Sequence, residues 1–137
     1  MKELKISAAA ENLDTVLDFV NTELEASGCP LKLQTQINIA IEEILVNIAN
    51  YAYKTVVPSE TGNVTMRIAV GDEVTIEFED NGVPYNPLEK EDPNISASAH
   101  DRKIGGLGIY MVKQIMDSVE YRHMDGKNIL IIRKVIL

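Results

Sequence analysis

The sequence predicts an α/β (α+β) fold in which helices pack against a mostly antiparallel sheet. Apolar residues recur at spacings of three and four in the segments 13–24 and 37–48, which is typical of helices with one buried side. Apolar and polar residues alternate in the segments 63–70 and 73–80, which is typical of half-buried strands. Because 137 residues are enough to bury a core, we expect a single domain over residues 1–137.

Composition excludes several classes of partner. The formal net charge is −8. A chain this acidic lacks the clustered Lys and Arg that hold nucleic acids, so an anionic ligand would need backbone amides, a helix terminus or a bound cation. The single cysteine, Cys29, excludes an internal disulfide framework and a thiolate zinc cluster. No apolar run reaches about eighteen residues, so we expect a cytoplasmic protein without a membrane partner.

The first third of the chain predicts a strand and two helices. Residues 2–7 alternate charged and apolar side chains, as in a short half-buried strand. Asn12 is a favoured residue for the N-cap of the first helix, and Gly28 predicts its end. We expect Pro30 in the first turn of the second helix, where its missing N–H costs nothing, and the end of that helix near Tyr53.

The second helix carries a polar stripe beside its buried one. The isoleucines at positions 37, 41, 44 and 48 form the buried stripe, while Glu43, Asn47 and Asn50 are spaced by four and three and project side by side. Asn is a poor helix former, so its presence inside an apolar segment needs a reason. Two interpretations remain open: a solvated helix face, or a carboxylate that acts as a base beside an amide oxygen that ligates a hard metal ion.

The strands 63–70 and 73–80 are joined by a Gly-Asp dipeptide that predicts a tight antiparallel hairpin. Alternation places Asp80 on the same side as the apolar residues 74, 76 and 78, facing the core. A carboxylate there is costly unless a hydrogen bond compensates it. Asp80 either caps the turn that follows it or serves a ligand.

The last third combines a long connection, a glycine-rich helix and two strands. Residues 88–103 show little periodicity and are long for a connection, which is typical of lids and binding loops. The segment 104–117 opens with three glycines and continues as an apolar helix, so its uncovered first-turn amides form an anion site. The segments 118–124 and 127–137 predict two final strands around an Asp-Gly turn.

Three short motifs then follow one another in a specific order. They are Glu-x-x-x-Asn at 43–47, Asp-x-Gly-x-Pro at 80–84 and Gly-Gly-Leu-Gly at 105–108. Together they resemble the N-box and the two glycine boxes of the GHKL ATPase and kinase superfamily. The short chain, Pro-Tyr-Asn-Pro at 84–87 and the run at 106–112 most resemble the bacterial anti-sigma factor serine kinases, which have a histidine-kinase-like ATPase domain. The resemblance covers the chain from Asn12 onward and implies a two-layer sandwich, a mostly antiparallel mixed sheet covered on one face by helices.

The resemblance implies a role for each motif residue. Asp80 would accept a hydrogen bond from the adenine amino group of ATP, and Gly82 would let the backbone approach the base. Asn47 would supply an oxygen to Mg²⁺ on the phosphates. Glu43 would be the general base for a serine hydroxyl or water, whereas its rival Glu42 aligns with residues 46 and 49. The other implied nucleotide-binding residues are Pro84, Gly106, Leu107, Gly108 and Ile109, with the amides of 106–108 on the phosphates.

Several positions depart from the family pattern or leave a choice open. Many relatives have a His where this chain has Tyr51. The last strand commonly supplies a Thr near the adenine, yet residues 127–137 contain neither Thr nor Ser. Arg102 and Lys103, at the end of the long connection, either close onto the γ-phosphate or form a solvated pair.

The resemblance implies an ATP- and Mg²⁺-dependent serine kinase that phosphorylates a small anti-sigma-factor antagonist and sequesters a sigma factor. Such kinases are typically homodimers. The alternative is a non-catalytic binding module that holds a partner when nucleotide is bound, and the intact Glu43 and Asn47 favour the kinase. A sensor histidine kinase is disfavoured, because His100 and His123 do not lie on a phosphoacceptor helix.

Overall fold

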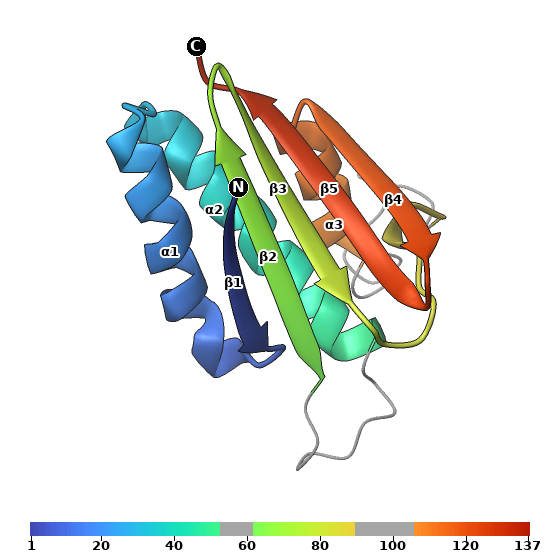
Figure 1. The fold of residues 1–137 in the computed structure, drawn as a ribbon. Helices are drawn as coiled ribbons and strands as arrows, with labels where there is room; N and C mark the ends of the chain where they lie inside the picture. Colours follow the sequence, from blue (N-terminus) through green and yellow to red (C-terminus); the bar gives the residue numbers. More distant parts are fainter. Residues whose placement is uncertain (53–61, 90–105) are drawn as a thin grey trace.

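Five antiparallel strands form one sheet in the order β1-β2-β3-β5-β4 (Figure 1). The computed structural model describes residues 1–52, 62–89 and 106–137. The strands are β1 (Lys2–Ser7), β2 (Asn63–Val70), β3 (Glu73–Asp80), β4 (Ser118–Met124) and β5 (Lys127–Val135). The helices are α1 (Leu13–Ala26), α2 (Leu31–Asn47) and α3 (Gly106–Ile115), with short turns η1 (Ala10–Asn12), η2 (Ile48–Ala52) and η3 (Pro87–Glu89).

Within the described residues, the helices α1, α2 and α3 lie on one side of the sheet, as Figure 1 shows. The core between the layers combines the alternate residues of the strands, such as Met66, Phe78 and Ile132, with the apolar stripes of α1 and α2. Phe78 and Ile132 are completely buried. The predicted two-layer sandwich, mostly antiparallel and covered on one face, is therefore confirmed. Within the described residues, no helix is both long and apolar enough to cross a membrane.

The connection between α1 and α2 follows the predicted residues with two local differences. Gly28 has a φ of 73°, and the N–H groups of Gly28 and Cys29 donate to the carbonyls of Glu25 and Leu24, so the glycine ends α1 as predicted. Pro30 occupies the N-cap of α2 rather than its first turn, so that prediction was wrong by one residue. Asn12 is the N-cap of α1 but makes no capping bond, because its amide donates to the carbonyl and the hydroxyl of Ser7 instead.

The predicted long second helix changes its geometry near its end. Regular α2 stops at Asn47, and residues 48–52 continue as a π-helical turn, η2. A π turn contains more residues than an α turn, so it rotates later side chains away from the stripe that α-helical spacing predicts. Asn50 is accordingly exposed, whereas Asn47 is buried.

Two hairpins and one long-range pairing place the ends of the strands together. Both predicted tight turns are present, at residues 71–72 between β2 and β3 and at residues 125–126 between β4 and β5. The pairing of β3 with β5 sets Asp80 opposite Asn128. At the other end of β5, the Lys134 ammonium donates to the carbonyl of Ile115, 2.6 Å away, at the C-terminus of α3. A cation there satisfies a free carbonyl and complements the helix dipole.

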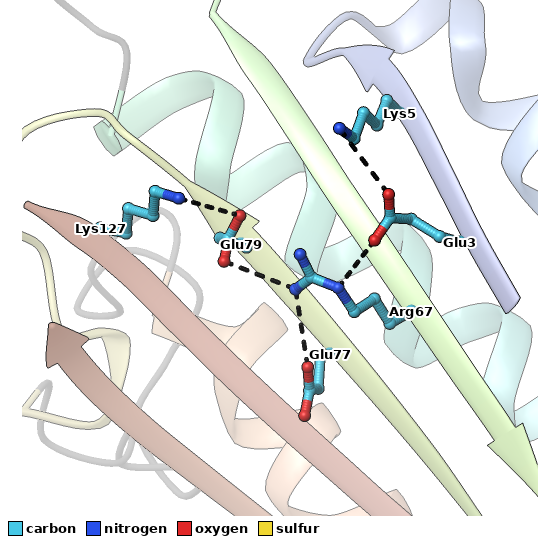
Figure 2. A network of polar contacts seen from close by, with 6 residues as sticks. All are labelled: Glu3, Lys5, Arg67, Glu77, Glu79 and Lys127. Carbon is cyan, nitrogen blue, oxygen red and sulfur yellow. Dashed lines mark hydrogen bonds and ion pairs between the residues drawn. The ribbon is translucent and has the colours of Figure 1, made fainter. Parts of the chain in front are cut away.

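The second face of the sheet carries charged side chains instead of helices (Figure 2). Arg67 is central: its guanidinium lies 2.9 Å from Glu3, 3.4 Å from Glu79 and 3.7 Å from Glu77. Lys127 extends the network through Glu79, at 3.7 Å. Partly exposed pairs of this kind stabilise a fold by only ~0–1 kcal/mol each. Their main consequence is a polar surface on the face opposite the helices.

Candidate functional site

Asp80 lies at the end of β3 and faces the helices, as strand alternation predicted. It is 5% exposed, and its Oδ1 accepts hydrogen bonds from the Gly82 N–H at 3.0 Å and the Asn128 amide at 2.9 Å. Burial raises the pKa of the Asp80 carboxyl, and these two hydrogen bonds oppose the rise by stabilising the ionised form. Asp80 therefore caps its own turn and also presents a carboxylate on the helix side of the sheet.

A small pocket opens beside this carboxylate. Its walls come from α2, η2, the end of β3, the segment after β3, α3, β4 and β5. The lining residues are Ile44, Asn47, Ile48, Asp80, Tyr85, Pro87, Ile109, Tyr121, Asn128 and Leu130. We call this cavity the Asp80 pocket. Apolar walls with a few polar groups suit a flat, partly polar ring.

Asn47 lines the Asp80 pocket and has a buried oxygen atom without a hydrogen-bond partner among the described residues. The side chain is 6% exposed, and its Nδ2 donates to the carbonyl of Glu43 at 3.0 Å. That bond fixes the amide orientation, because a carbonyl can only accept. Among the described residues, the buried Oδ1 has no partner. An amide oxygen left free in this way suits a hard cation such as Mg²⁺. The described residues hold no cluster of three or more His, Cys, Asp or Glu side chains that could hold a metal ion.

Glu43 lies against the first turn of α3. A Cβ built on Gly108 would stand 2.3 Å from Oε2 of Glu43 and 3.2 Å from its Cδ. The fold therefore brings Glu43 of the first motif against Gly108 of the third motif, which lies 65 positions later in the sequence. Position 108 needs a glycine for this approach, because any side chain would meet the carboxylate. Glu43 thus lies beside the glycine-rich helix, and Asn47 lines the same pocket as Ile109 of that helix.

Glu42 and Asn50 belong to a different surface. Both are exposed and line a second pocket, whose other walls are residues 9, 13, 45, 46 and 49. Glu42 thus projects away from the Asp80 pocket. The choice of Glu43 over Glu42 is consistent with this arrangement, and its chemical role stays a prediction.

The remaining predicted site residues fall into three groups. Ile109 is 3% exposed and lines the Asp80 pocket, whereas Pro84 is exposed and does not line it. Gly106 begins α3, and Leu107 follows it in that helix. Arg102, Lys103 and Gly105 lie outside the described residues, as does the side chain of Tyr51.

Sequence reasoning missed three polar residues of the pocket: Asn128, Tyr85 and Tyr121. Asn128 is 4% exposed and binds Asp80 directly. One signal was available, because Asn128 has the same strand parity as the buried Leu130 and Ile132. A polar residue on the apolar side of a strand is costly unless it is hydrogen-bonded.

The chain is similar to several known proteins. A family model described as "Histidine kinase-like ATPase domain" matches residues 6–134. The serine-protein kinase RsbW of Bacillus mycoides is 27% identical over 138 residues, covering 97% of this chain and 84% of that protein. The serine/threonine-protein kinase BtrW of Bordetella bronchiseptica is 28% identical over 97 residues, covering 71% of this chain and 67% of that protein.

A solved structure shows the same fold. The crystal structure of the RsbU and RsbW domains of Rv1364c from Mycobacterium tuberculosis matches 99% of this chain with a TM-score of 0.63 and 16% sequence identity. The match spans 33% of that longer chain, so the likeness concerns one part of it. At this identity the likeness extends to the fold and not to the chemistry.

Proposed function

The chain belongs to the histidine kinase-like ATPase domain family, and on this premise we propose that it is an ATP-dependent protein serine kinase that acts as an anti-sigma factor. Its relatives RsbW and BtrW are named serine and serine/threonine kinases. The proposed substrate is a small anti-sigma-factor antagonist protein, and the proposed second partner is a sigma factor that the kinase, as a cytoplasmic homodimer, sequesters. The observation that carries the proposal is the position of Glu43, against the first turn of α3 and one helical turn from the free oxygen of Asn47.

The Asp80 pocket is the proposed site of the adenine ring. Oδ1 of Asp80 accepts two hydrogen bonds, and within the described part of the chain Oδ2 accepts none. That oxygen is available to the exocyclic amino group of adenine. Ile44, Ile109 and Leu130 provide apolar walls for the ring. Gly82 and Pro84 would form the nearby backbone of the base site.

The phosphates are proposed to bind at the start of α3. The amides of Gly106, Leu107 and Gly108 lie in its first turn, where free N–H groups and the helix dipole attract anions. Bound Mg²⁺, held by Oδ1 of Asn47, would neutralise phosphate charge. A chain of net charge −8 repels an anionic ligand, and the backbone amides and the cation would offset this repulsion.

Glu43 is the proposed general base. Its carboxylate accepts the proton of the attacking serine hydroxyl as the serine oxygen forms its bond to the γ-phosphorus and the bond to the ADP oxygen breaks. Two features of the structure suit this role. The carboxylate is half-buried, and it lies beside the helix turn proposed for the phosphates.

The test compares two adjacent glutamates. The purified protein is incubated with γ-labelled ATP, Mg²⁺ and a lysate of its source organism, in parallel with Glu43→Ala and Glu42→Ala. The proposal expects a small phosphoserine protein that is labelled by the wild type and by Glu42→Ala, but not by Glu43→Ala. Absence of label in all three, with ATP still bound, would overturn the kinase in favour of a non-catalytic binding module. Equal labelling by Glu43→Ala would move the base elsewhere.

A further inference from the structure

Asn128 uses its entire hydrogen-bonding capacity inside the Asp80 pocket. Its Nδ2 donates to Oδ1 of Asp80 and to the carbonyl of Val83, each at 2.9 Å. Its Oδ1 accepts from the Tyr85 N–H at 3.2 Å and from the Tyr121 hydroxyl. An amide has two N–H donors and two lone pairs, so all four are used. A flipped amide would set its oxygen against two acceptors, and the orientation is therefore fixed.

This arrangement determines which part of Asp80 is available. Both hydrogen bonds to the carboxylate end on Oδ1, from the Asn128 amide and the Gly82 N–H. Both are donors, and donors favour the ionised carboxylate. Oδ2 is left as an acceptor without a partner among the described residues. The carboxylate is thus presented to the pocket in one orientation, and both donors favour its ionised form.

The other charged groups near Asp80 act in opposite directions. Glu79, its neighbour on β3, raises the pKa of Asp80, whereas His123 on β4 lowers it. Tyr121 also faces the carboxyl from β4, and Tyr85 lines the same pocket from the segment after β3. Burial is the largest influence and favours the protonated form. The Asn128 amide is the largest influence in the opposite direction.

Resting on the proposed function, we propose that Asn128 is a positioning residue that makes the site select adenine over bases with a carbonyl at the same ring position. It does so by holding Asp80 as a proton-free acceptor with Oδ2 unoccupied. Adenine offers an amino donor to such an oxygen. Hypoxanthine and guanine offer a carbonyl oxygen instead, which a carboxylate repels and only a protonated Asp80 could bind. Loss of the Asn128 donor would therefore weaken ATP binding and relax base selectivity together.

The test measures binding of ATP and of inosine triphosphate by calorimetry across the acidic pH range. Asn128→Leu keeps the shape of the side chain without its polar groups. On acidification, this variant is expected to lose ATP affinity at a pH about one unit higher than the wild type does. Its ratio of ATP affinity to ITP affinity is expected to fall about tenfold. Asn128→Thr, whose hydroxyl can donate, should restore part of both. Gly71→Ala, whose new Cβ would meet nothing within 4 Å, is the control and should show the pH dependence of the wild type.

A second measurement follows Asp80 without nucleotide. Carbon-detected NMR titration of its carboxyl should show a higher pKa in Asn128→Leu than in wild type. If the leucine variant does not fold, Asn128→Ala takes its place in both experiments. An unchanged titration and an unchanged ATP-to-ITP ratio would overturn the role of Asn128. If the wild type bound ATP at no pH, the proposed function would be contradicted. The proposal that this site selects adenine would then be contradicted as well.

Discussion

An alanine at position 108 would place its Cβ 2.3 Å from Oε2 of Glu43 and 3.2 Å from its Cδ. Carbon and oxygen atoms do not approach so closely, so the carboxylate would have to retreat by about 1 Å, a shift that for a catalytic group costs about 100-fold in rate. We therefore expect Gly108→Ala to lower phosphotransfer about 100-fold. The backbone around Gly108 need not move, because the group in its way is the end of a flexible side chain.

The same substitution should leave the fold intact. Gly108 lies within α3 and does not have a positive φ, so alanine is compatible with its backbone. Alanine stabilises a helix by roughly 0.5–1 kcal/mol relative to glycine, and moving the carboxylate offsets part of this gain. We expect a melting temperature that is unchanged or up to about 4 °C higher. Loss of activity without loss of stability would identify a displaced catalytic group.

The assay pairs circular-dichroism melting with single-turnover transfer from γ-labelled ATP. Gly71→Ala is the matched control, since its new Cβ would meet nothing within 4 Å. The control should keep wild-type transfer. Transfer by Gly108→Ala within twofold of wild type would refute the claim that Glu43 acts from its observed position. A lower melting temperature would show that the Glu43 side chain cannot move away from the new Cβ, and would refute our expectation that the fold tolerates the substitution.

Three further predictions concern the base, the metal ion and the core. Asp80→Asn replaces an acceptor oxygen with an amide donor, so ATP affinity measured by calorimetry should fall roughly 100-fold while the circular-dichroism spectrum stays the same; undiminished affinity would exclude Asp80 as the adenine partner. Asn47→Leu removes the free Oδ1, so Mg²⁺ should no longer strengthen ATP binding, and a retained Mg²⁺ effect would place the ion elsewhere. Phe78→Ala empties a fully buried position and should cost ~3–5 kcal/mol in urea unfolding, whereas a loss below about 1 kcal/mol would contradict tight packing there.

Local patterns were sufficient for most of the elements. Strand alternation predicted β2 and β3 with their observed ends and placed Asp80 on the buried side. Gly28 ended α1 because a left-handed residue is needed there, and the Asp-Gly turn at 125–126 joined the last two strands for the same reason. These features depend on neighbours within a few residues, so they are visible in the sequence itself.

The end of α2 was the exception among the elements. α-Helical spacing predicted that Asn50 would continue the stripe of Glu43 and Asn47, but the π turn over residues 48–52 rotated it to the surface. No local sequence pattern predicted this change from α-helical to π-helical geometry. One turn of altered helix was enough to remove a predicted stripe residue from the site.

The sequence by itself therefore determined the elements, the inward carboxylate and the three motifs, because periodicity and turn chemistry act over short distances. Only the tertiary structure decided which groups meet. Asn128 reaches Asp80 because β5 pairs with β3, 48 positions away in sequence, and Glu43 reaches Gly108 because α3 packs on α2. Strand pairing and helix packing are set by the fit of the whole core, which no local pattern contains.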